Sequence, residues 1–155
     1  LGPFASVAYQ TEFTKNNGAP RLKVVRGKTG LKLFNGTVIK ELYAAAVGEY
    51  DFTYSGEEVT KSAYEIGIRA EKPISDQVKF QLEAYYRDYL SFSKYVATDL
   101  KYELSVIGRM DVKVYKKISI APYIQYFQGE ARGVGKKGSN FMTGISIAYA
   151  DLFNL

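Results

Sequence analysis

The stretch that decides the fold is residues 101–127, KYELSVIGRMDVKVYKKISIAPYIQYF, in which apolar and polar residues alternate almost without a break. An alternation with a period of two places successive side chains on opposite faces of a β-strand. One face carries charged residues such as Glu103, Arg109 and Asp111, and the other carries apolar residues such as Leu104 and Val106. The stretch therefore raises the question of which face points into the protein.

The length and composition of the chain predict one ordered domain. The 155 residues are enough for a sizeable core, and no shift in composition marks a boundary, so residues 1–155 are treated as a single domain. Hydrophobic residues reach 46% against 24% charged residues, which is typical of a folded chain. The net charge is +5, but Lys and Arg are scattered among acids, so we expect no nucleic-acid partner.

Two residue types are missing, and their absence excludes several kinds of chemistry. Without cysteine there are no disulfides, thiolate metal sites or cysteine nucleophiles. Without histidine there are no imidazole metal ligands and no catalytic triads with a histidine base. The sequence also lacks the ladder of acids around a glycine that a calcium loop needs. We therefore expect no enzymatic activity, no cofactor and no metal site.

Period-two alternation covers most of the chain, and helical periodicity is nearly absent. The pattern predicts eight strands at about 5–14, 22–34, 37–54, 63–72, 78–92, 99–115, 118–128 and 141–153. Such a series of strands is typical of an antiparallel up-and-down meander.

The predicted connections alternate between short and long. Asn35-Gly36 indicates a two-residue hairpin, because both central positions of that turn need positive φ. PISDQ and Lys116-Lys117 indicate two further short turns. The other connections, KNNGAPR, SGEEVTKS, SKYVAT and GEARGVGKKGSN, are predicted to be longer loops. In a meander the short turns gather at one end and the long loops at the other, as in bacterial outer-membrane barrels.

Sorting each strand by parity separates an apolar face from a charged face. The charged face carries equal numbers of acids and bases, as expected if these groups pair with one another away from water. We predict an interior charge network made of Arg26, Lys28, Glu49, Asp51, Glu65, Arg69, Glu83, Arg87, Glu103, Arg109 and Asp111.

Three geometries compete for this pattern. An open sheet would need covering helices, and no segment resembles one. A soluble lipocalin-like barrel would turn the apolar face inward around an apolar ligand, and a membrane barrel would turn it outward to lipid. The bulk of the apolar side chains, the balance of charge and the aromatic residues near strand ends favour the membrane barrel. The predicted fold is thus an all-β, eight-stranded antiparallel transmembrane β-barrel with a polar, charge-paired interior.

The pattern resembles the small eight-stranded outer-membrane proteins of Gram-negative bacteria, of the OmpA and OmpX type. The resemblance covers nearly the whole chain and rests on pattern. The stretch MTGISIAY, residues 142–149, looks like the terminal assembly signal of that class, although Met142 stands where a polar residue is usual and NL follows Phe153. The resemblance implies a bacterial outer-membrane location, contact with outer-membrane lipid and lipopolysaccharide, and a monomer. Some such barrels are lipid enzymes, but their sites contain histidine, which this chain lacks.

Pro122 is the main misfit, because a strand paired on both sides loses a hydrogen-bond donor at proline. We predict a bulge or a distorted register there.

The long loops are the expected place of any specific role, whether in envelope structure, surface interaction or adhesion. Arg132, Lys136 and Lys137 in the glycine-rich loop are candidates for contact with lipopolysaccharide phosphates. The alternatives that stay open are a soluble barrel that binds an apolar ligand and a small-solute pore.

Overall fold

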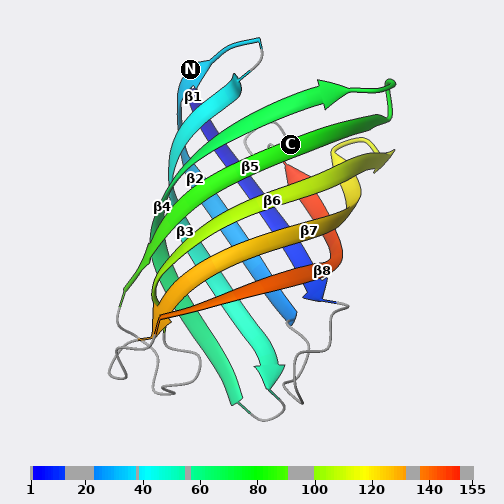
Figure 1. Cartoon of the computed structure of the whole chain (residues 1–155). Coiled ribbons are helices and arrows are strands. Elements are labelled where there is room, and N and C mark those ends of the chain that lie inside the picture. The colour runs from blue at the N-terminus through cyan, green and yellow to red at the C-terminus, as the bar shows by residue number, and fades with distance from the viewer. Residues whose placement is uncertain are drawn as a thin grey trace.

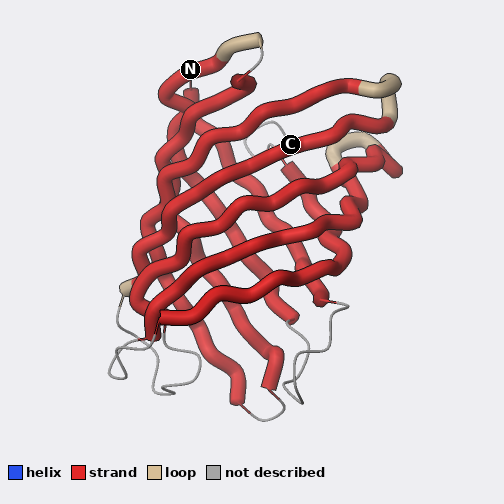
Figure 2. Tube along the Cα trace, in the orientation of Figure 1, coloured by secondary structure: helices blue, strands red, loops and turns tan. Residues whose placement is uncertain are grey.

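The structure is a computed structural model that describes residues 2–12, 23–37, 39–54, 57–90, 100–131 and 137–150. The described residues form strands joined by turns, with no helix among them (Figure 2). The strands are β1 (Gly2–Glu12), β2 (Lys23–Asn35), β3 (Ile39–Tyr54), β4 (Glu57–Pro73), β5 (Val78–Tyr89), β6 (Leu100–Tyr115), β7 (Ile118–Ala131) and β8 (Lys137–Ala150).

The eight strands form a closed antiparallel barrel in sequence order (Figure 1). Each strand pairs with the next, and β8 returns to pair with β1, where Ala8 faces Ala148. Closure leaves the sheet without an edge strand. The all-β, eight-stranded, closed antiparallel architecture expected from the alternation is therefore confirmed.

The short turns lie at one end of the barrel. Residues 36–38, 74–77 and 116–117 connect the strands at this end, where β1 also begins and β8 ends (Figure 1). Residues 13–22, 55–56, 90–99 and 132–136 connect the strands at the opposite end. We call these the short-turn end and the long-connection end. Three of the four connections at the long-connection end are longer than every connection at the other.

Two of the predicted short turns are confirmed. In the β4–β5 turn the amides of Ile74 and Ser75 both donate to the Val78 carbonyl, at 2.9 and 3.0 Å. The β6–β7 turn is the pair Lys116-Lys117, and Lys116 has a positive φ of 42°. Positive φ is the conformation that a tight two-residue hairpin requires.

The predicted two-residue hairpin at Asn35-Gly36 is wrong. Asn35 is still in β2 and faces Glu41 of β3, and the Gly36 amide donates to the Lys40 carbonyl at 3.2 Å. The β2–β3 register shifts between Lys32 and Phe34. After this shift the last pair of the two strands is Asn35 and Glu41, which leaves more than two residues between them.

The predicted long loop SGEEVTKS is also wrong, because β4 begins at Glu57 rather than near residue 63. Residues 57–62 are mostly charged or hydroxylic and do not alternate with apolar residues, so the sequence pattern did not indicate a strand there. Its backbone nevertheless continues the ladder to β3, where Tyr50 faces Thr60 and Glu49 faces Lys61. The β3–β4 hairpin reaches farther than its neighbours at the long-connection end (Figure 1).

The bulge predicted at Pro122 is absent. Arg109 faces Tyr123 and Val112 faces Ile120, so the β6–β7 register is the same on both sides of the proline. Pro122 faces Ile145 of β8, and no β6 residue is assigned as its partner. Because proline has no amide hydrogen, the β6–β7 pairing is interrupted at Pro122, but the register of the two strands does not change.

Candidate functional site inside the barrel

The barrel is charged inside and apolar outside. Leu82, Val106 and Ile147 are exposed, by 56%, 44% and 44% of their surfaces. Arg87 is fully buried, and Glu103 is 7% exposed. The strand alternation produces both faces, because neighbouring residues of one strand point to opposite sides. The apolar face of the opening stretch therefore points away from the barrel axis.

Arg87 on β5 is the centre of the interior network. Its guanidinium forms an ion pair with Glu65 on β4. It also donates to Glu103 Oε2 on β6 at 3.0 Å and to the Tyr89 hydroxyl at 2.9 Å. Glu49 Oε2 on β3 lies 3.8 Å from Arg87 Nη1. One buried cation is thus shared by carboxylates from three other strands, which is the pairing that a buried charge requires.

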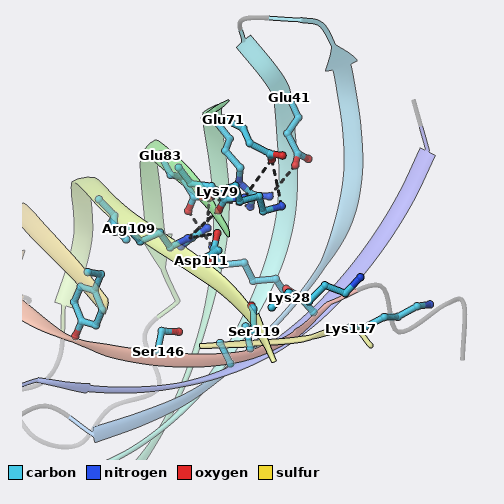
Figure 3. Close-up of a pocket in the computed structure, with 18 of the residues that line it drawn as sticks. Lys28, Glu41, Glu71, Lys79, Glu83, Arg109, Asp111, Lys117, Ser119 and Ser146 are labelled. Carbon is cyan, nitrogen blue, oxygen red and sulfur yellow. Dashed lines mark hydrogen bonds and ion pairs between the residues drawn. The ribbon is translucent and has the colours of Figure 1, made fainter. Parts of the chain in front are cut away.

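A second cluster lies nearer the short-turn end and is centred on Glu83 of β5 (Figure 3). Arg69 bridges Glu83 at 2.9 Å and Glu41 at 2.7 Å. Arg109 lies 3.4 Å from Glu83 and 3.6 Å from Asp111. These pairs cross β3, β4, β5 and β6, so they form one charged wall of the interior.

Lys28 on β2 joins the two clusters. Its Nζ lies 2.6 Å from Glu65 Oε2 and 3.8 Å from Glu83 Oε1. The same ammonium lies 5.2 Å from the ring centroid of Tyr85, within the range of a cation–π contact. The network is therefore continuous from the Arg87 cluster to the Glu83 cluster.

Neutral polar residues complete the network on the side of β1 and β7. Arg26 pairs with Glu49 at 2.8 Å and donates to Gln10 Oε1 at 2.9 Å. Gln10 donates to Gln125 Oε1 at 3.2 Å, and Gln125 donates to Ser105 Oγ at 3.1 Å. Hydrogen bonds thus pass across the barrel, from β2 through β1 and β7 to β6.

The structure brings together ten of the eleven residues predicted for the interior network. Asp51 lies in β3, where its backbone faces Val24 and Val59, but its side chain lies outside the described residues. The prediction from sequence missed neutral members that are buried on the same face as the charged residues: Gln10, Tyr43, Gln81, Tyr85, Tyr89 and Gln125. Parity would have found all of them except Gln125, because each of the others lies two positions from a charged residue of its own strand. Gln125 has no charged residue at an even spacing in β7.

The predicted loop site is not assembled in the described part of the chain. Arg132 and Lys136 lie outside the described residues. Lys137 is the first residue of β8, paired with Glu130, rather than a loop residue. The β7 and β8 ladders extend farther toward the long-connection end than the alternation indicated, and this extension takes Lys137 into the strand.

A cavity of about 640 Å³ lies inside the barrel beside the charged wall. It is lined by Ser75 and Asp76 of the β4–β5 turn and by Lys116 and Lys117 of the β6–β7 turn, so it reaches the short-turn end. Ser119 of β7 and Ser146 of β8 lie on the wall opposite Arg109 and Glu83 (Figure 3). Ala8 and Ala148 continue this second wall, which we call the small wall.

The described residues contain no cluster of three or more histidine, cysteine or acidic side chains arranged to hold a metal ion. No described helix is long and apolar enough to cross a membrane. The sequence matches no protein-family model and no curated protein.

Proposed function

We propose that this chain is a transmembrane β-barrel of a bacterial outer membrane, without enzymatic activity, whose interior is closed by its charge network. The observation that carries the proposal is the orientation of the two faces. Large apolar side chains such as Leu82 and Ile66 are exposed on the outside, while Arg87 and Glu65 are buried inside. Hydrocarbon is a better solvent than water for such an exterior, and a closed barrel leaves no unpaired strand edge in it.

The distribution of exposed charge supports this proposal. Among the described side chains, every exposed charged residue lies in a turn or within three positions of a strand end: Lys23, Lys40, Lys72, Asp76, Asp88, Lys113 and Lys116. The middle of the exterior is left to apolar and small residues. A band without charge between two charged rims is the surface that a membrane-spanning barrel presents to lipid.

Aromatic pairs on the exterior gather toward the long-connection end. Tyr86 of β5 and Tyr102 of β6 stack with their ring centroids 6.0 Å apart. Tyr126 of β7 and Phe141 of β8 lie 6.4 Å apart. Tyr and other aromatic residues favour the interface between hydrocarbon and headgroups, and barrels of the outer membrane carry them as girdles.

The soluble alternative requires the opposite interior. A lipocalin-like barrel would line its cavity with apolar side chains to hold an apolar ligand. The cavity here is lined by charged groups such as Arg69, Glu83 and Arg109. An apolar ligand would strip water from these groups without supplying hydrogen bonds, which is unfavourable. This lining favours the membrane barrel over the soluble one.

Refolding with and without detergent tests this proposal. We expect the chain to be monodisperse only in detergent or lipid, and to run faster on a gel before boiling than after it, because the closed barrel resists unfolding. A monodisperse monomer in detergent-free buffer would contradict a membrane location. Far-ultraviolet circular dichroism in both conditions separates a folded soluble barrel from an unfolded chain.

We further propose that specific contacts are made through the long connections, with lipopolysaccharide as the nearest partner and with the barrel as a monomer. Arg132, Lys136 and Lys137 are the basic residues of the β7–β8 segment that would meet its phosphates. Replacing all three with Gln should weaken binding of purified lipopolysaccharide, while Lys40→Gln at the short-turn end should not. Equal binding of lipopolysaccharide by the triple variant and the unmodified chain would contradict a role of these three residues in that binding.

A further inference from the structure

The interior cavity has two unlike walls. The wall built by β3 to β6 carries the charged groups around Glu83, which are paired with one another. The small wall, built by β7, β8 and β1, carries short side chains such as Ser119, Ser146 and Ala148 beside a few larger ones: Phe4, Gln10, Ile118 and Tyr123. The space between the walls, about 640 Å³, is within the range of small-molecule pockets. The network therefore closes only part of the interior and leaves room for a solute in the rest.

The small wall offers hydrogen bonds that no other described residue uses. Ser119 and Ser146 line the cavity, and neither hydroxyl has a protein partner among the described residues. Each hydroxyl can both donate and accept a hydrogen bond. A polar solute, rather than an apolar one, would satisfy such a wall.

The cavity lining carries an excess of positive charge. Of the described residues that line it, ten are Lys or Arg and five are Asp or Glu. Glu49, Glu65 and Glu103 of the Arg87 cluster offset part of this excess. At the mouth the lining includes three lysines, Lys113, Lys116 and Lys117, against one acid, Asp76. A concave site with walls of low dielectric constant focuses such a field and raises the local concentration of anions.

We propose that this cavity binds a small oxyanion, a solute that carries phosphate or carboxylate, which enters from the short-turn end. The lysines at the mouth attract the anion, and the hydroxyls of Ser119 and Ser146 hydrogen-bond it against the small wall. The proposal goes beyond the membrane location and does not depend on it, because the cavity lies inside the barrel.

The absence of cysteine makes a direct test available. Ser146→Cys places a unique thiol on the small wall, and Thr37→Cys places one in the exposed β2–β3 turn at the same end as a reference. The full chain, folded in detergent, is treated with a negatively charged and a positively charged methanethiosulfonate reagent, each with and without inorganic pyrophosphate. We expect the rate ratio to favour the negative reagent about tenfold more at Ser146→Cys than at Thr37→Cys. Pyrophosphate should slow the reaction of the thiol in Ser146→Cys and leave the reaction of the thiol in Thr37→Cys unchanged.

Several results would overturn the proposal. These are an equal ratio at both positions, a preference for the positive reagent at Ser146→Cys, a thiol there that reacts with neither reagent, or no protection by pyrophosphate. Ser119→Cys repeats the measurement from β7, so the result does not depend on one substitution. Replacing Lys113, Lys116 and Lys117 with Gln should reduce both the ratio and the protection.

Phosphate could also reach the mouth as a lipid headgroup, and a second arm separates the two sources. Mixed micelles of the detergent with phosphatidylglycerol offer the headgroup without a soluble anion. A solute site predicts that pyrophosphate protects Ser146→Cys and that the headgroup does not. Protection by phosphatidylglycerol with none by pyrophosphate would assign the lysines to lipid and refute the cavity site.

Discussion

Arg87 illustrates how a charged residue is tolerated at the centre of a small barrel. Its side chain has no exposed surface, and it shares hydrogen bonds or ion pairs with Glu65, Glu103 and Tyr89. Each of these partners comes from the strand alternation rather than from a local sequence motif. The energetic role of Arg87 is therefore to satisfy several buried carboxylates at once, and these carboxylates would be costly without it.

Replacing Arg87 with Met should strongly destabilise the barrel. The substitution leaves Glu65 and Glu103 buried beside an apolar chain, and breaking a buried pair in this way costs about 3–5 kcal/mol. Urea unfolding in detergent micelles, followed by circular dichroism, measures the change.

The control for this experiment removes a buried charge of each sign. In the double variant Arg87→Met with Glu65→Gln, one carboxylate no longer needs a cation, so part of the loss should be recovered. A single variant as stable as the parent chain would show that the network does not hold the barrel together.

At the scale of the strand, alternation predicts which face a residue occupies better than it predicts where a strand ends. The parity of Leu104 and Glu103 follows from the sequence because one register error would reverse every side chain on the strand. The start of β4 at Glu57 could not be read from alternation, because the pairing of residues 57–62 depends on β3 as a neighbour. The same holds for the neutral residue Gln125, whose role appears only when Gln10 and Ser105 are brought beside it.

Gly144 on β8 gives a prediction about closure of the barrel. A Cβ at this position would collide with the Thr11 carbonyl of β1 and with the ring of Tyr123 on β7. The Tyr123 hydroxyl donates to that carbonyl at 3.4 Å. The glycine therefore leaves room for a contact from β7 to β1 that passes over β8, at the β8–β1 seam where the barrel closes. Gly144→Ala should therefore lower the free energy of unfolding by about 1–3 kcal/mol.

The matched control is Gly48→Ala on β3. A Cβ at Gly48 meets nothing within 4 Å, so this variant should unfold like the parent chain. The temperature at which the fast-migrating gel band disappears provides the comparison. Equal temperatures for the Gly144 and Gly48 variants would show that close packing at the seam is unimportant.

The β6–β7 turn gives a prediction of the opposite sign. Lys116 has a φ of 42°, a conformation that disfavours residues with a Cβ by roughly 1 kcal/mol. Lys116→Gly should therefore stabilise the barrel by about that amount, whereas Lys117→Gly, outside the positive-φ region, should give no gain. Chemical unfolding of the two variants distinguishes them. A loss of stability in Lys116→Gly would mean that the lysine side chain matters more than the backbone strain.

For the whole molecule, the two clusters joined by Lys28 should block a continuous aqueous path. Ions would have to cross the part of the interior where Arg87, Glu65 and Glu103 are paired. We therefore expect little or no steady conductance when the chain is added to a planar bilayer. Large, stable channels in the parent chain would contradict a closed interior.

Contact between the apolar exterior and lipid is the central proposal for this protein, and the absence of native tryptophan allows this contact to be measured. Leu82→Trp places a unique fluorophore on the middle of the exterior, and Thr37→Trp places one in an exposed turn. Both variants are reconstituted into vesicles whose lipids carry bromine on their acyl chains. We predict strong quenching of Leu82→Trp and weak quenching of Thr37→Trp. An unquenched Leu82→Trp in a correctly folded barrel would contradict the membrane-spanning orientation.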